Sequence, residues 1–387
     1  MNKRVMAAVL CFVMLAATAC GGRKKEESSD KEQQNAAAAA TVEEKAAVEK
    51  YTPAVHEEGK YYVGVIQQAD HGALSLAAEG FRDHLSELLG DEVVLDEKVS
   101  DGTDEKTNEI IDHFIQDKDD LILAAGSGAL RQAAAQTKDI PIVGAAVTDF
   151  IIAGGVSSNG EPGGNVTGIS DLPPMVSQRD LLLQLNSDGE QIGILFCSEE
   201  VNSEFQCKLM EKYLSDADTP WKEYTFTGAA DMEEKVKAAC EENGVIYLPC
   251  DNVLAVNMDV VSKYAVEYGT KVFTSDGDMC KKGGLVSYGV DYYAIGTEAA
   301  NMAYDILVYG GEDGEVDEED EDRGNTAKMA IDRLSDTASA WYNPVMAEAV
   351  GWEPSGTYEE LDVERPDQEK TAEDSAAETT AAKESDS

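Results

Sequence analysis

The sequence predicts an α/β protein of two lobes, each built on a doubly wound parallel sheet, with crossover strands joining the lobes. Three observations support this prediction. Short apolar segments alternate with amphipathic helical segments along most of the chain, as in parallel sheets with helices on both faces. Pro173 and Pro174 interrupt this alternation, which places a boundary between two series of units. Polar turns follow the apolar segments, at the sheet edge where such folds bind ligands.

The first unit shows the pattern of strand, turn and helix. Residues 61–66 are aromatic, β-branched or glycine and include no proline, which favours a buried strand. The polar turn that follows contains Gln68 and His71, so it is the first candidate for a wall of a binding site. Apolar residues then recur at helical spacing over 74–89, and Gly90 ends the helix.

Further units complete a first lobe over residues 59–172. Strands are expected at 93–99, 121–125, 140–145 and 163–171, and helices at 105–115 and 129–135. Gly126, Ser127 and Gly128 follow the third strand and begin a helix, whose exposed N–H groups and dipole suit a carboxylate or a phosphate. A dinucleotide site is disfavoured because Arg131 stands where the third glycine of its fingerprint is required.

The second series of units forms a second lobe over residues 173–283. Its strands are expected at 191–196, 221–225, 245–248 and 271–274. Its helices are expected at 176–185, 232–240 and 254–268, and one more helix follows the turn 198–203 and ends at residue 214. Residues 284–308, a strand followed by a helix, are expected to return to the first lobe. Residues near 324–356 are candidates for a return to the second lobe. Between these two segments, residues 309–323 form an acidic loop without the ligand order of an EF-hand.

Residues 1–20 have the features of an export signal. Lys3 and Arg4 precede an apolar run over 5–16 that is too short to span a bilayer. The small residues before Cys20 and the glycines after it resemble the lipobox of bacterial lipoproteins. That resemblance implies a lipid on Cys20 and a location on the outer face of the cell membrane.

Two segments contain too few large apolar residues to form a core. Residues 21–58 are predicted to be a flexible acidic stalk and residues 357–387 a disordered tail. The whole chain has 31 Lys and Arg against 76 Asp and Glu, a net charge of −45, which argues against nucleic acid as a partner.

The sequence contains no motif of a metal site, a cofactor site or a catalytic centre. Five cysteines remain after the signal and the lipobox, an odd number without C-x-x-C spacing: Cys197, Cys207, Cys240, Cys250 and Cys280. A nucleophile elbow, a Walker loop and a His-Glu-x-x-His motif do not occur. His71 is therefore interpreted as a structural or ligand-contacting residue.

Several strand-end motifs together resemble a family of bacterial ABC transporter substrate-binding lipoproteins that includes tryptophan- and tyrosine-binding members. The motifs are Gln67, Gln68 and His71; Thr148 and Asp149; 163–171; Ser198, Glu199, Asn202 and Ser203; 249–252; Ser275 and Asp276; and 289–293. The resemblance covers 61–308, and 342–352 resembles the closing helix of the family. It implies the type I periplasmic-binding fold, a ligand held between the lobes, and an ABC permease and an ATPase as partners. Gly72 departs from the pattern, since proline is usual there.

An α-amino acid ligand would need acceptors for its ammonium group and donors for its carboxylate. Asp251 or Asp276 is the candidate for the ammonium group, and Ser127 and Ser203, near helix starts, are the candidates for the carboxylate. The other expected ligand-binding residues are Gln68, His71, Thr148, Asp149, Ser170, Asp171, Asn202, Asn252 and Asp291. Each of them alone is more often a helix cap or a turn former, but their convergence at strand ends favours a binding site.

The expected ligand is an aromatic or other hydrophobic amino acid, with another small amino acid, a nucleoside or a sugar as alternatives. A sensory receptor of the same fold and a hydrolase on the same scaffold are the alternative classes of function. We expect a monomeric binding protein and not an enzyme.

Overall fold

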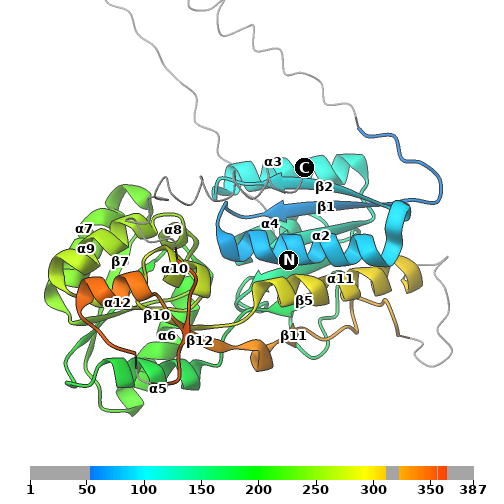
Figure 1. The fold of residues 1–387 in the computed structure, drawn as a ribbon. Coiled ribbons are helices and arrows are strands. Elements are labelled where there is room, and N and C mark those ends of the chain that lie inside the picture. The colour runs from blue at the N-terminus through cyan, green and yellow to red at the C-terminus, as the bar shows by residue number, and fades with distance from the viewer. Residues whose placement is uncertain (1–52, 311–321, 355, 364–387) are drawn as a thin grey trace, which may run out of the picture. The chain divides into compact units, whose positions relative to one another are not determined.

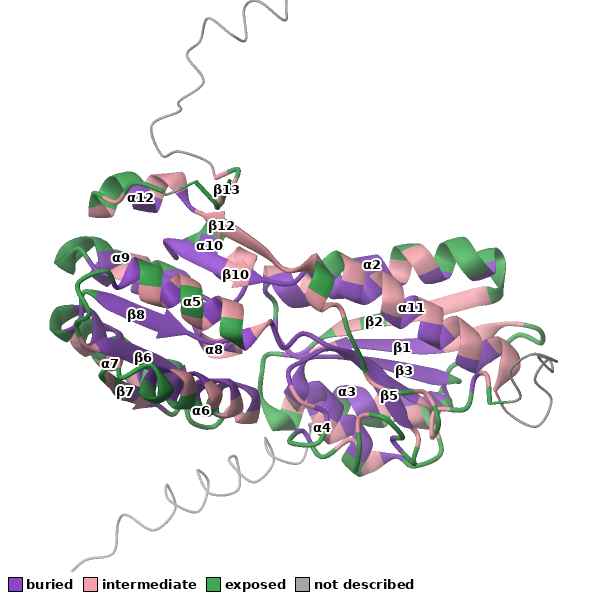
Figure 2. Cartoon of the chain, turned by 90° about the horizontal axis from the view of Figure 1, so that it is seen from below, coloured by how far each residue is buried: buried purple, intermediate pink, exposed green. Residues whose placement is uncertain are grey.

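The structure, a computed structural model, describes residues 53–310, 322–354 and 356–363. Within these residues the chain forms a six-stranded and a seven-stranded sheet, each covered by helices (Figure 1). The central strands of both sheets are buried, whereas the helices are buried on one side only (Figure 2). The predicted signal with Cys20, most of the stalk, most of the acidic loop and residues 364–387 lie outside the described residues.

The first lobe has the strand order β11-β5-β4-β3-β1-β2, and its pairings are parallel. Its main strands are β1 (Tyr61–Gln67), β2 (Val93–Val99), β3 (Leu121–Ala125), β4 (Ile142–Val147) and β5 (Val166–Ser170). Its helices are α2 (Gly72–Leu89), the short η1 (Gly90–Glu92), α3 (Asp104–Asp117) and α4 (Ser127–Gln136). The three strands β3, β4 and β5 are buried along their whole length, which explains why their sequences are apolar runs without alternation.

The second lobe has the strand order β13-β12-β10-β9-β8-β6-β7. Its strands are β6 (Ile192–Cys197), β7 (Trp221–Phe226), β8 (Val245–Leu248), β9 (Lys271–Thr274), β10 (Val286–Gly289), β12 (Ser339–Tyr342) and β13 (Glu359–Glu360). Its helices are α5 (Met175–Leu185), α6 (Val201–Asp216), α7 (Ala229–Glu242), α8 (Asn252–Ala255), α9 (Met258–Tyr268), α10 (Gly277–Lys282), η2 (Ser335–Thr337) and α12 (Pro344–Val350). The pairing of β12 with β10 is antiparallel, and the remaining pairings of this sheet are parallel.

The chain crosses between the lobes three times in its described part. The first crossing follows β5, the second joins β10 to α11 (Tyr292–Tyr309), and the third joins β11 (Asp332–Arg333) to β12. Helix α11 packs along α2 on the first lobe (Figure 1). The two helices approach closely because glycines face the partner backbone, and a Cβ on Gly296 would lie 2.0 Å from the carbonyl oxygen of Ala77. The predicted α/β fold of two parallel-sheet lobes with crossovers is therefore confirmed.

The structure corrects the placement of two segments. The strand predicted to return to the first lobe with residues 284–308 instead pairs with β9 in the second sheet, and only α11 returns. The short α10 connects β9 to β10, and a right-handed crossover of this kind places consecutive parallel strands side by side. The prediction of a disordered tail over 357–387 is also wrong for the first residues of this range, because β13 pairs in parallel with β12.

The helix predicted over 254–268 is divided into α8 and α9. None of the helices in the part of the chain that the structure describes is long and apolar enough to cross a membrane.

Candidate functional site

A cavity lies between the two lobes, at the carboxyl ends of strands from both sheets. The space between its atoms is about 320 Å³, including the part open to solvent. The lining residues are His71, Ala73, Leu74, Gly126, Ser127, Ala146, Thr148, Asp171, Asn202, Cys250, Asp251, Asn252, Ala255, Asp276 and Tyr292. This described lining includes three aspartates and neither lysine nor arginine, so its side chains carry negative charge only.

Asp171 is the cavity aspartate with the least support from the protein. It follows β5 at the first crossing and is 4% exposed. Its Oδ2 accepts a hydrogen bond from the Tyr292 hydroxyl at 3.1 Å, while its Oδ1 is buried without a hydrogen-bond partner in the described chain. Burial raises the pKa of the Asp171 carboxyl to about 6. A cationic hydrogen-bond donor at Oδ1 would favour the charged form and satisfy the unpaired oxygen.

The other two cavity aspartates cap helices of the second lobe. The carboxylate of Asp251 accepts hydrogen bonds from the Cys197 N–H at 2.7 Å and the Leu254 N–H at 2.9 Å, so both of its oxygens are engaged. Asp276 accepts one hydrogen bond from the Met279 N–H at 2.8 Å. Burial raises the pKa of Asp251 and of Asp276 to about 7. The structure therefore brings both predicted ammonium acceptors to the cavity, but Asp171 has the more available carboxylate.

On the first lobe, Ser127, the predicted donor to a ligand carboxylate, lines the cavity at the start of α4. Ser127 is the first residue of α4, and its Oγ accepts a hydrogen bond from the Thr148 N–H at 3.3 Å. Gln68 does not line the cavity, because its Oε1 accepts a hydrogen bond from the Gly128 N–H at 2.7 Å. Ser170 likewise supports the wall, since its hydroxyl donates to the carbonyl oxygen of Thr148 at 2.9 Å.

His71 connects the two lobes beside the cavity. Its Nε2 lies 2.8 Å from Oδ1 of Asn252, and the Asn252 Nδ2 donates to the Glu200 carboxylate at 2.9 Å. Because the amide oxygen only accepts, Nε2 carries the hydrogen of the neutral imidazole and Nδ1 is left as an acceptor. Burial lowers the pKa of His71. The Nδ1 is buried without a partner among the described residues, so it is a second unsatisfied acceptor in addition to Oδ1 of Asp171.

A second interlobe contact lies next to His71. The Gly72 N–H donates to Oδ2 of Asp278, a residue of α10, at 3.0 Å. A Cβ on Gly72 would lie 2.2 Å from Oδ1 of Asp278, so a larger residue here would displace the Asp278 carboxylate from this contact. Proline at residue 72 would also remove the donating N–H.

Three further predicted ligand residues lie outside the cavity lining, where hydrogen bonds within the protein engage their side chains. Ser203 is 0% exposed, and its hydroxyl points to the Glu200 carboxylate at 3.4 Å and the carbonyl oxygen of Cys250 at 3.5 Å. Asp149 accepts from the Ile152 N–H at 2.8 Å in the turn after β4. Asp291 caps α11 by accepting from the Ala294 N–H at 3.1 Å. Asn202 lines the cavity and donates to the Cys250 carbonyl at 2.8 Å.

Two cavity residues with an O–H or S–H group were missed because their side chains are common in cores. Tyr292 is the first residue of α11, and its position directly after the second crossing was the available signal. Cys250 lines the cavity with its Sγ 3.6 Å from the Tyr292 hydroxyl, and burial raises the pKa of its thiol well above the usual range. Sequence reasoning treated this cysteine only as one of an unpaired set.

Comparison with known proteins gives one family model and several relatives. The model described as "ABC transporter substrate binding protein" matches residues 62–328. A tyrosine-binding protein of Clostridioides difficile (strain R20291) is 30% identical over 248 residues, which span 63% of this chain and 72% of the relative.

Two solved structures are also similar. The ABC domain from Streptococcus pneumonia in complex with L-Trp has 26% identity and a TM-score of 0.69, covering 76% of this chain and 95% of that one. The ligand-free, open structure of a substrate-binding protein with adhesive properties from Clostridium difficile has 27% identity and a TM-score of 0.59, covering 79% of this chain and 100% of that one.

Proposed function

The chain belongs to the family of ABC transporter substrate-binding proteins, and we propose that it captures an aromatic or other hydrophobic amino acid and delivers it to an ABC permease. Its fold is that of the type I periplasmic-binding proteins. Members of this family bind small ligands and are not enzymes.

The observation that carries the amino-acid proposal is the pair of unsatisfied acceptors, Asp171 Oδ1 and His71 Nδ1. Both residues line a cavity whose described side chains include neither lysine nor arginine. An α-ammonium group brings three N–H donors and a positive charge, so it would satisfy these acceptors and stabilise the Asp171 carboxylate. A neutral sugar would provide hydroxyl donors but no charge.

The carboxylate of the same ligand would bind at the start of α4. Ser127 provides a hydroxyl there, and the first turn of a helix has N–H groups without intrahelical acceptors and a positive dipole end. The Gly128 N–H already donates to Gln68, so the Ser127 hydroxyl and the remaining N–H groups of this turn would hold the carboxylate. Thr148 lies beside Ser127 and lines the same wall. The negative lining elsewhere in the cavity disfavours a second anionic group on the ligand.

The ligand side chain would pack on the apolar part of the lining. This part comprises Ala73, Leu74, Ala146, Ala255 and the ring of Tyr292. Such a surface favours a hydrophobic group, and the tyrosine-binding relative and the L-Trp complex of a second relative support an aromatic one.

The test is a calorimetric and thermal-shift comparison of L-tyrosine and L-tryptophan with tyramine, desaminotyrosine, sugars and nucleosides. At a hundredfold excess over the dissociation constant, a ligand stabilises the folded protein by about 2.7 kcal/mol. We expect binding of at least one L-amino acid, and loss of binding when either the carboxylate (tyramine) or the ammonium group (desaminotyrosine) is missing. Binding of a sugar or nucleoside with no amino acid bound would refute the ligand class.

We also propose that the protein is held on the outer face of the cell membrane by a lipid on Cys20, as a monomer. The support is the lipobox-like sequence that ends at Cys20. Detergent-phase partitioning checks this: the wild-type chain should enter the detergent phase and Cys20→Ser should not. Equal partitioning of the two proteins would exclude the anchor.

A further inference from the structure

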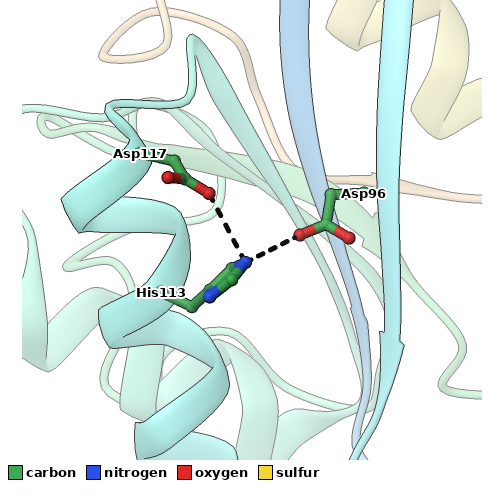
Figure 3. Close-up of side chains that lie close together, drawn as sticks. All are labelled: Asp96, His113 and Asp117. Carbon is green, nitrogen blue, oxygen red and sulfur yellow. Dashed lines mark ion pairs between the residues drawn. The ribbon is translucent and has the colours of Figure 1, made fainter. Parts of the chain in front are cut away.

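A separate group of side chains lies on the first lobe, between β2 and α3. His113 and Asp117 lie one turn apart on α3, and Asp96 lies on β2. The His113 Nε2 is 3.2 Å from Oδ2 of Asp96 and 3.4 Å from Oδ2 of Asp117. Figure 3 shows both carboxylates pointing at this one nitrogen. The three potential ligand atoms lie within 4.8 Å of one another.

A hydrogen bond alone does not account well for this arrangement. Nε2 of His113 carries at most one hydrogen, so it cannot donate a full-strength hydrogen bond to both carboxylates. A single cation between the three groups would satisfy all of them. Nitrogen and oxygen ligands at about 2.0–2.1 Å from a tetrahedral zinc ion lie roughly 3.3 Å apart, which agrees with the two distances measured here. We propose that Asp96, His113 and Asp117 bind a divalent cation of the zinc class.

The carboxylates are oriented by contacts to their other oxygens. Oδ1 of Asp117 accepts a hydrogen bond from the Ala54 N–H at 2.6 Å. Oδ1 of Asp96 accepts one from the Lys98 ammonium group at 2.5 Å. In both residues Oδ2 remains directed at His113. Hydrogen bonds of this kind to the non-ligating oxygen are typical of the groups that surround metal sites.

A second, independent observation is the buried carboxylate of Asp119. This residue is 7% exposed, and its Oδ2 has no hydrogen-bond partner in the described chain. Asp119 follows Asp117 by two residues, just beyond the end of α3, and its carboxylate adds to the negative charge of Asp96 and Asp117. In the part of the chain that the structure describes, Lys98 pairs with Asp96, so the three carboxylates leave an excess of negative charge for a divalent ion to neutralise.

The mixed ligand set selects the class of ion. Imidazole with carboxylates suits zinc and its first-row neighbours, whereas calcium and magnesium prefer oxygen ligands alone. None of the three residues lines the interlobe cavity. Helix α3 runs back from the carboxyl end of β2, so its last turns lie at the opposite edge of the sheet. The ion would join β2, α3 and the segment at Ala54, where the described chain enters the lobe.

The test uses the full chain, freed of metal with a chelator and titrated with Co²⁺ as the spectroscopic probe. Excess Ca²⁺ in the buffer competes with Co²⁺ for nonspecific binding to carboxylates outside the proposed site. We expect saturable visible absorption from one Co²⁺ per chain, and His113→Gln should weaken this binding by about 100-fold or more, since it removes a direct ligand. The ligand affinity of the interlobe cavity should not change.

The matched control is His84→Gln. His84 also faces a carboxylate, with its Nδ1 3.4 Å from Glu87, but it does not belong to the group that converges on His113. His84→Gln should keep wild-type Co²⁺ absorption and melting temperature in Co²⁺. If His113→Gln does not fold, Asp96→Asn provides the same comparison. Absence of saturable absorption in the wild-type chain, or equal absorption in the His113 and His84 variants, would refute the proposal.

Discussion

Replacing Asp171 with asparagine is expected to stabilise the ligand-free protein and at the same time to weaken ligand binding. Burial raises the pKa of the Asp171 carboxyl from 3.8 to about 6. One pKa unit corresponds to about 1.4 kcal/mol, so the buried charge lowers the free energy of unfolding by about 3 kcal/mol at neutral pH. Asparagine has nearly the same shape and no charge, so the variant avoids this loss.

The pH dependence follows from the direction of the shift. At a pH of about 3 or less, well below the ordinary pKa of 3.8, the carboxyl group is protonated in the folded and the unfolded chain, and its effect on stability is absent. As the pH rises towards the folded-state pKa of about 6, the unfolded chain releases its proton first and the wild-type protein loses stability. The gain from Asp171→Asn should therefore be small near pH 4 and complete above about pH 7.

The assay combines thermal unfolding across this pH range with calorimetry. For a chain of this length, 3 kcal/mol corresponds to a rise of roughly 5 °C in the melting temperature. The affinity for the amino acid identified by the ligand screen should fall about 30-fold or more, because a buried charge-assisted hydrogen bond is lost. This combination of greater stability and weaker binding is not expected of a residue with a purely structural role.

Asp149→Asn is the matched control, since Asp149 ends the neighbouring strand but caps a turn outside the cavity. It should leave the ligand affinity unchanged and give no gain in stability. The reasoning is wrong if Asp171→Asn lowers the melting temperature at pH 8, or if this variant binds the ligand with wild-type affinity.

Two further substitutions test contacts between elements. Gly72→Ala should weaken the ligand affinity several-fold, because the added Cβ would lie 2.2 Å from Oδ1 of Asp278 on the other lobe. Calorimetry measures this affinity, and an unchanged value would show that the bound form does not use this contact. Gly296→Ala should lower the free energy of unfolding by about 1–3 kcal/mol, as overpacking commonly does. Its Cβ would lie 2.0 Å from the carbonyl oxygen of Ala77 on α2, and a urea midpoint equal to that of the wild type would contradict this account.

The sequence predicted the fold well because the strand–turn–helix unit is a local pattern. The apolar run 121–125 is too short for a helix and too apolar for a half-exposed strand, which leaves a buried parallel strand. The strand β10 was assigned to the wrong sheet because its residues suit either sheet equally. Its place is decided by the short connection through α10, a helix that the sequence did not reveal.

The candidate site was predicted less well for a physical reason. Aspartate at a strand end caps a helix, forms a turn or contacts a ligand with the same carboxylate, and residue type does not distinguish these uses. Asp149 and Asp171 both follow strands of the first sheet, yet the Asp149 carboxylate accepts a backbone N–H while Oδ1 of Asp171 has no partner. The difference arises from where the second lobe covers the first, which is tertiary information.

The charge of the cavity also bears on how ligand binding could drive lobe closure. Asp171, Asp251 and Asp276 line the cavity together, and burial raises the pKa of all three. Opening of the lobes would return water to these carboxylates and relieve the unfavourable burial of their charge. A cationic ligand would offset the unfavourable burial of these charges while the lobes remain closed. We therefore expect the free protein to favour an open arrangement and an ammonium-bearing ligand to shift the population towards closure, since its charge gives it a higher affinity for the closed form.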